Sequence, residues 1–240
     1  MKMPPPLELT GDPEERNYRS DRFTLGSLTS VTLYHDFLCP WCWVGFLQSR
    51  RLQSDYGLTF DWRGAELMPA SIPHTPAPPK PVDPNAPPPP PAPKNRFDLF
   101  VESEGIVMPS PRPSFVRTHN PLLGCEWARV EGPEAFDIYN EAVYRAFWEQ
   151  RQDISDLEIL ESLAKAGGLN GTALVESIRA ERYAENIVPF DDDAYVTGIR
   201  HVPTFIFGAE EFLAEANYAD LSHAAERFQF RLERHRAKKE

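Results

Sequence analysis

The chain has 240 residues, of which 41% are apolar and 25% charged, a composition typical of a soluble globular protein. The formal net charge of -11 argues against nucleic acid or an anionic membrane surface as a partner. No apolar run reaches the roughly 18 residues of a membrane span, and the first residues lack the apolar core of a secretory signal. Because three cysteines cannot build a disulfide framework, we expect a cytoplasmic protein whose oligomeric state the sequence leaves open.

The first part of the chain predicts a polar arm followed by a strand, a helix and a strand. Residues 1–28 are polar and broken by proline and glycine, so we expect an extended arm. Alternating apolar residues predict a strand over 31–37, and helical spacing predicts a helix over 40–56 that Gly57 ends. A second strand is predicted over 58–63. This order indicates a parallel β-α-β unit, which we assign to residues 29–70.

A proline-rich stretch follows at 71–94. Twelve of the residues from 73 to 93 are proline, and proline supports neither a helix interior nor a central strand. We predict an exposed, stiff linker. An alternative function for the stretch is to dock a proline-recognising partner.

Residues 95–187 have a helical pattern and predict an inserted all-helical subdomain. Predicted helices begin near residue 96 and cover 122–130, 134–151, the residues after 155 up to Gly167, and 171–183. Ser155 to Glu158 has the pattern of a capping box, and Asn170 that of an N-cap. The helix over 134–151 carries an apolar stripe of Phe136, Tyr139, Val143 and Phe147, which we interpret as core.

The last part, 188–240, returns to strands. It begins with an acidic run at 191–193, for which we expect solvent exposure. Two short apolar runs at 204–207 and 211–214 predict a β-hairpin. A closing helix then carries Leu221, Ala225, Phe228 and Leu232 on one face.

Two cysteines at the junction of the first strand and helix indicate a functional site. Cys39 lies at the expected helix N-terminus, and Pro40 suits the first helical position. The free amides and the positive end of the helix dipole favour an anion there, so we expect the Cys39 thiol to ionise more readily than a free cysteine. Cys42, one turn later, can attack a mixed disulfide formed at Cys39 and release the partner.

Two other interpretations of this pair are a zinc half-site and two inert buried thiols. Zinc needs four ligands, but the chain has only one further cysteine, Cys125, and neither His35 nor His201 gives a recognised spacing. We therefore expect no metal. For Cys125, on an apolar helix face, we expect a buried and unreactive thiol.

Three stretches resemble a known family. They are 36–42 (Asp-Phe-Leu-Cys-Pro-Trp-Cys), 147–148 together with 154–160, and 198–207 (Gly-Ile-Arg-His-Val-Pro-Thr-Phe-Ile-Phe). They resemble the FrnE-like dithiol oxidoreductases, within the DsbA-like branch of the thioredoxin superfamily. The resemblance implies an α/β class, a thioredoxin fold with an inserted all-helical subdomain.

The resemblance also implies roles for single residues. Cys39 would be the exposed attacking thiol and Cys42 the buried resolving thiol. Pro203 would be a cis-proline facing them, and Val202 would offer backbone groups to an extended substrate. The residues between the thiols, Pro40 and Trp41, would tune the reduction potential. Residues 118–128 lack the Ala-His pair of many relatives, so no substrate contact is carried over from there.

We therefore predict a thiol–disulfide oxidoreductase or isomerase that acts on protein or small-molecule thiols and disulfides. We expect no cofactor beyond the redox-active disulfide, with glutathione left open. The alternative is a glutathione-dependent isomerase or transferase of the 2-hydroxychromene-2-carboxylate isomerase or kappa-class type. Those relatives of the fold typically carry serine at the position of Cys39 and need no second cysteine, so Cys42 favours redox chemistry.

Overall fold

The computed structural model describes residues 29–74, 93–190, 199–208 and 211–237. The predicted N-terminal arm, most of the proline-rich linker and the acidic run at 191–193 lie outside these residues. Within the described part of the chain, strands and helices form an α/β fold, which confirms the predicted fold class. No described helix is both long and apolar enough to cross a membrane.

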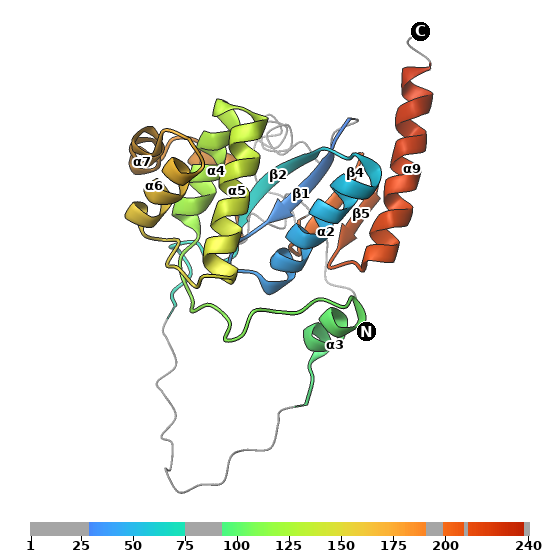
Figure 1. Cartoon of the computed structure of the whole chain (residues 1–240), viewed down its shortest axis with the longest axis horizontal. Helices are drawn as coiled ribbons and strands as arrows, with labels where there is room; N and C mark the ends of the chain where they lie inside the picture. Colours follow the sequence, from blue (N-terminus) through green and yellow to red (C-terminus); the bar gives the residue numbers. More distant parts are fainter. Residues whose placement is uncertain (1–28, 75–92, 191–198, 209–210, 238–240) are drawn as a thin grey trace, which may run out of the picture.

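A mixed sheet lies at the centre of the molecule (Figure 1). In its described residues the strand order is β3-β2-β1-β4-β5. The strands are β1 (Val31–His35), β2 (Phe60–Glu66), β3 (Val188–Pro189), β4 (Thr204–Phe207) and β5 (Glu211–Ala214). β1 pairs with β2 in parallel, whereas β4 runs antiparallel to both β1 and β5. The predicted β-α-β unit and the hairpin are therefore confirmed.

Helix α2 (Pro40–Tyr56) joins β1 to β2, with the bounds that the apolar spacing predicts. Proline occupies its first position, where no amide donor is needed. Gly57 ends it in the left-handed conformation, at φ 62°, and its N–H donates to Gln53. The closing helix α9 (Tyr218–Arg236) lies beside β5 at one side of the sheet in Figure 1.

Most of the helices between β2 and β3 gather at the opposite side of the sheet (Figure 1). They are α4 (His119–Glu131), α5 (Pro133–Trp148), α6 (Leu157–Ala166) and α7 (Gly171–Arg179), followed by the short 3-10 helix η1 (Ala184–Asn186). The predicted stripe on α5 is core, because Phe136, Tyr139, Val143 and Phe147 are all at most 5% exposed. A separate helix, α3 (Arg96–Ser103), lies apart from this group near the start of α2.

Some predicted boundaries were wrong for local reasons. α4 begins at His119 rather than residue 122, because Pro121 is tolerated in its first turn. The N-cap of α6 is Asp156, whose carboxylate accepts from the N–H of Glu158, so the capping box predicted from Ser155 does not form. α5 ends three residues early and α7 four residues early. Strand β3 was not predicted, since two residues carry no periodicity.

The core joins the sheet to the helices on its two sides. Every residue of β1 is buried, as expected for a central strand covered on both faces. Aromatic side chains from α2, α5 and the sheet pack against one another, with Phe46 stacked on Tyr144 at 4.8 Å between ring centroids. Trp148 of α5 donates from Nε1 to the carbonyl oxygen of Phe37 at 3.0 Å. This bond anchors the loop that leads from β1 into α2.

Candidate active site

Cys39 is the N-cap residue of α2. Its backbone is extended, at φ -76° and ψ 121°, while its carbonyl oxygen already accepts from the N–H groups of Cys42 at 3.0 Å and Trp43 at 3.2 Å. Its side chain makes no capping hydrogen bond to the helix. The sulfur is therefore placed at the positive end of the helix dipole, where a negative charge is favoured.

The two thiols have different surroundings. Cys39 donates from Sγ to the carbonyl oxygen of Val202 at 3.4 Å, and Cys42 accepts at Sγ from the N–H of Asp36 at 3.4 Å. Both are free thiols. Burial raises the pKa of the Cys42 thiol well above its usual value, and the neighbouring Cys39 thiol raises it further.

The expected exposure of Cys39 needs correction. Its residue is 7% exposed against 1% for Cys42, so both thiols are buried and Cys39 is only the more accessible one. The carbonyl of Val202 lies against its sulfur, which the local sequence could not reveal.

The loop before β4 completes the site from a distant part of the chain. The Val202–Pro203 peptide bond is cis, and both residues are buried. Gly45 of α2 allows this loop to come close, because a Cβ at position 45 would lie 2.9 Å from both Cβ and Cγ of Pro203. The missing side chain of Gly45 thus permits the close approach of α2 and the Pro203 loop.

Trp41, between the two thiols, packs against α3 as well as against the main core. Its ring lies 5.0 Å from the ring of Phe97 and 4.7 Å from that of Phe100, measured between centroids. The guanidinium group of Arg96 lies 5.1 Å from its ring centroid. The residue between the thiols is therefore in contact with a helix that follows the proline-rich linker.

Asp36 is a residue of the site to which the sequence analysis gave no role. Its side chain is fully buried and accepts from the N–H groups of Leu38 at 2.8 Å and Leu67 at 2.6 Å. Burial raises the pKa of Asp36 to about 6, against the opposing effect of these two amides. The buried hydroxyl of Thr118 lies beside the same carboxyl group and also lowers the pKa, although it makes no regular hydrogen bond. The sequence signal that could have indicated Asp36 is a carboxylate directly after an apolar strand.

The sequence profile of the DSBA-like thioredoxin domain matches residues 30–226, which is most of the chain. The chain belongs to this family. The uncharacterised protein YwbO of Bacillus subtilis is 27% identical over 182 residues, covering 74% of this chain and 86% of that protein.

Solved structures share the fold of this DsbA-like protein at low sequence identity. A "probable DsbA oxidoreductase" from Streptomyces coelicolor superimposes with a TM-score of 0.61 at 16% identity, covering 83% of this chain and 89% of its own. BdbD from Bacillus subtilis gives 0.52 at 16% identity, covering 85% and 87%. A 2-hydroxychromene-2-carboxylate isomerase gives 0.56 at 22% identity, covering 88% and 98%. At these identities the likeness concerns the fold alone.

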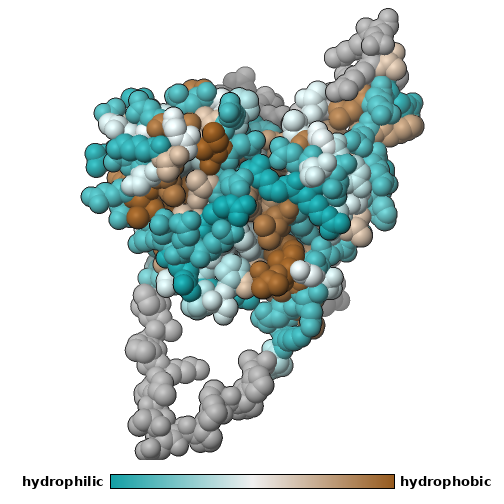
Figure 2. Space-filling view, viewed as in Figure 1, coloured by the Kyte–Doolittle hydropathy of each residue, from teal (hydrophilic) through white to brown (hydrophobic). Residues whose placement is uncertain are grey.

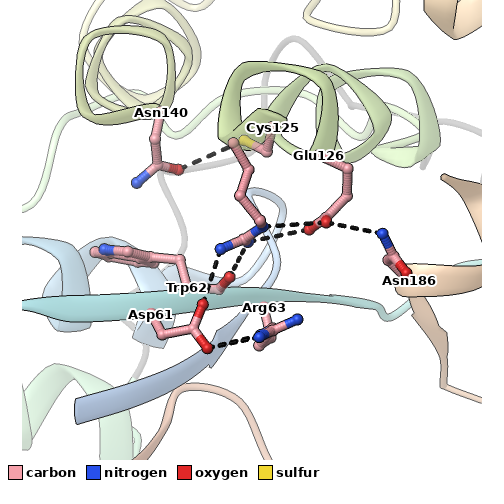
Figure 3. Close-up of polar contacts among 8 residues, drawn as sticks. Asp61, Trp62, Arg63, Cys125, Glu126, Asn140 and Asn186 are labelled. Atoms are coloured by element: carbon pink, nitrogen blue, oxygen red, sulfur yellow. Dashed lines mark hydrogen bonds and ion pairs between the residues drawn. The ribbon is translucent and has the colours of Figure 1, made fainter. Parts of the chain in front are cut away.

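The third cysteine of this DsbA-like chain lies on α4, in contact with α5. Cys125 is 2% exposed and donates from Sγ to Oδ1 of Asn140 at 3.8 Å (Figure 3). Burial raises the pKa of this thiol well above its usual value. These surroundings confirm that Cys125 is buried, and its low reactivity stays a prediction.

The histidines considered as zinc ligands have other surroundings. His35 is buried, contacts the hydroxyl of Tyr144 through Nδ1 at 2.9 Å, and has a pKa lowered to about 3 by burial. His201 is exposed. In the described part of the chain, no three or more His, Cys, Asp or Glu side chains are grouped so that they could hold a metal ion.

Proposed function

We propose that this DsbA-like protein is a thiol–disulfide oxidoreductase in which Cys39 is the nucleophile and Cys42 the resolving thiol. The observation that carries the proposal is the placement of Cys39 at the N-cap of α2, with Cys42 one turn behind it and more deeply buried. Cys39 is the more accessible of the two thiols, whereas burial opposes the Cys42 thiolate. The order of attack follows from this difference.

The exchange balances in two steps. The thiolate of Cys39 attacks one sulfur of a substrate disulfide, so that a mixed disulfide forms and the first substrate thiolate leaves. Cys42 then loses its proton and attacks the sulfur of Cys39, so that the enzyme disulfide forms and the second substrate thiolate leaves. Two electrons pass from the dithiol to the substrate, and two protons accompany the leaving sulfurs. The reverse sequence oxidises a substrate dithiol.

The neighbouring residues have supporting roles in this proposal. Pro203 limits the space opposite the thiols, and the backbone of Val202 is the group that an extended substrate segment would pair with. The residues between the thiols, Pro40 and Trp41, affect the reduction potential through the stability of the thiolate.

The finer assignment is to the FrnE-like group, on the three sequence stretches given above. The substrates are protein or small-molecule thiols and disulfides, and no cofactor beyond the redox pair itself is required, with glutathione left open as a co-substrate. The small number of cysteines supports a reducing compartment, the cytoplasm.

Three cysteine variants test the proposal in an insulin-reduction assay and in oxidation of a small dithiol. We expect Cys39→Ser to lose nearly all activity and Cys42→Ser to accumulate a mixed disulfide that mass spectrometry detects. Cys125→Ser, the matched control, should retain the wild-type rate. Normal turnover by Cys39→Ser would overturn the assignment. Glutathione-dependent isomerase turnover that survives in Cys42→Ser would favour the isomerase alternative.

A further inference from the structure

Leu67 and Thr118, the two ends of a long segment between β2 and α4, both lie beside Asp36. After β2, the N–H of Leu67 donates to the Asp36 carboxylate, and Thr118, the N-cap of α4, lies beside the same group. Arg117 closes the base of this segment, because its guanidinium donates to the carbonyl oxygens of Met68, Pro69 and Ile72 at 2.6 to 2.9 Å. Residues 67–118 therefore start and end next to the active-site loop.

Helix α3, which belongs to this segment, packs beside the two thiols. Helix α3 packs on Trp41 through Phe97 and Phe100, and Phe97 and Val101 form a small apolar cluster with Val44 of α2. Figure 2 shows a hydrophobic patch that runs from α2 onto α3. The apolar side chain of Trp41, next to Cys42, is thus in contact with the protein's own helix α3.

Side-chain contacts hold α3 in this position. Glu104, at its C-terminal end, accepts from Nε2 of Gln48 at 3.2 Å and from the N–H of Tyr218 at 2.8 Å. Arg96 pairs with Glu215 at 3.0 Å, although the arginine side chain is 77% exposed. An ion pair with an exposed arginine contributes little stability, whereas the two hydrogen bonds to Glu104 are partly buried.

The helix also satisfies its own N-terminus. Asn95 accepts from the N–H of Asp98, and the Asp98 carboxylate accepts from the N–H of Asn95, which completes a capping box. The cluster around Phe97 meets the main core through Trp41 and Met108, which pack against both. Release of α3 would break its contacts to Trp41, Gln48, Tyr218 and Glu215, while the capping box at its own N-terminus would stay within the helix.

We propose that α3 is a movable cover that restricts Cys39 to low-molecular-weight disulfides. With α3 docked on Trp41, the helix lies beside a residue between the two thiols, and Cys39 and Val202 are only 7% and 4% exposed. A small disulfide needs access to the sulfur alone, whereas a protein disulfide must also place its chain beside Val202 and therefore requires α3 to leave. The inference rests on the proposed redox function and names its substrate class.

The test compares two aspartate substitutions on the same helix. Phe97→Asp places a charge under α3, where the residue is 7% exposed, whereas Leu99→Asp, the matched control, places it on the outer face, where the residue is 55% exposed. The readouts are rates with oxidised glutathione and with insulin, and alkylation of Cys39 by iodoacetamide and by a polyethylene-glycol-linked maleimide. Hydrogen exchange of α3 reports whether the helix has left.

We expect the wild type and Leu99→Asp to react faster with oxidised glutathione than with insulin, and faster with iodoacetamide than with the polyethylene-glycol-linked maleimide. In Phe97→Asp the preference should fall by about tenfold or more, because an open state that is normally a minor population becomes the main one. A variant that lacks residues 94–105 should show the same loss. An unchanged preference while α3 exchanges freely, or a wild type that reacts equally with both reagents, would overturn the cover.

The experiments can contradict the proposed redox function and the proposed cover separately. Absence of turnover with both disulfides in the wild type would contradict the redox function alone, because the alkylation ratio measures access to Cys39 without turnover. Normal turnover with an unchanged alkylation ratio in the Phe97→Asp variant would contradict the cover alone.

Discussion

His119, the first residue of α4, is held between two carboxylates. Nδ1 contacts Oε2 of Glu66 at 2.9 Å, and Nε2 contacts Oε2 of Glu181 at 2.8 Å. The hydrogen bond to Glu66 is the main cause that raises the pKa of His119 to about 9, with Glu181 contributing and burial opposing. Because Glu66 ends β2 and Glu181 follows α7, the imidazolium joins the sheet to the helical subdomain.

This pKa predicts a pH dependence of stability. A histidine whose pKa rises on folding, here from about 6.5 to about 9, stabilises the protein fully below about pH 6.5 and loses that effect as the pH rises through 9. The free energy of unfolding should therefore fall between these values, and fall less in His119→Gln. Urea denaturation on both sides of the window measures it. Glu181→Gln should show an intermediate slope, and equal slopes in wild type and His119→Gln would contradict the prediction.

At Gly45, α2 and the Pro203 loop lie so close together that one added methyl group would have to displace one of them. In Gly45→Ala the new Cβ would lie 2.9 Å from Cβ and Cγ of Pro203, so the loop or the helix must shift. We expect a destabilisation of about 1–3 kcal/mol from overpacking. We also expect slower disulfide exchange, since Val202 moves away from Cys39. Ser54→Ala, an exposed position of the same helix, is the control. An unchanged exchange rate would show that the loop position is unimportant for the chemistry.

At the scale of elements, the sequence pattern and the structure give different N-cap residues for α6. The sequence pattern favours Ser155 as the N-cap, but the structure uses Asp156, while Ser155 bonds through Oγ and N to the carboxylate of Asp153. Asp156→Ala should therefore cost about 1 kcal/mol of unfolding free energy. Ser155→Ala should cost less. Chemical denaturation of the two variants decides between them, and the reverse order would support the capping box.

At the scale of the whole molecule, a polar cluster joins α4 to the sheet (Figure 3). Arg129 pairs with Asp61 of β2 at 2.8 Å and with Glu126 at 3.1 Å, and it also donates to the carbonyl oxygen of Trp62. Asn186 donates to Glu126 from the far end of the insertion. Glu126 is 2% exposed, so these partners take the place of water around its carboxylate.

Removing the arginine should therefore weaken the whole assembly. We expect Arg129→Met to lower the free energy of unfolding by about 3 kcal/mol, because it leaves the buried carboxylate of Glu126 without its cation. Glu126→Gln in the same chain should restore part of the loss. A double-mutant cycle by urea denaturation measures the coupling, and purely additive effects would argue against the pair.

Signals along the chain were enough for the local structure and for part of the site. The alternating run before Cys39 predicted β1, and the apolar spacing with Gly57 at its end predicted α2 with the correct bounds. The paired cysteines at a helix start, together with the stretch at 198–207, led to the DsbA-like family that the profile match shows. Such features depend on neighbours within a few residues, so they can be recognised without the fold.

The sequence by itself thus determined that this chain is an α/β protein with a dithiol at a helix N-terminus. Only the tertiary structure decided that the Cys39 sulfur meets Val202, that Asp36 accepts from the N–H of Leu67, and that α3 packs on Trp41. It also decided the pairing of β3 with β2. These contacts join residues far apart in the chain, where packing and burial choose the partner and no local pattern records it.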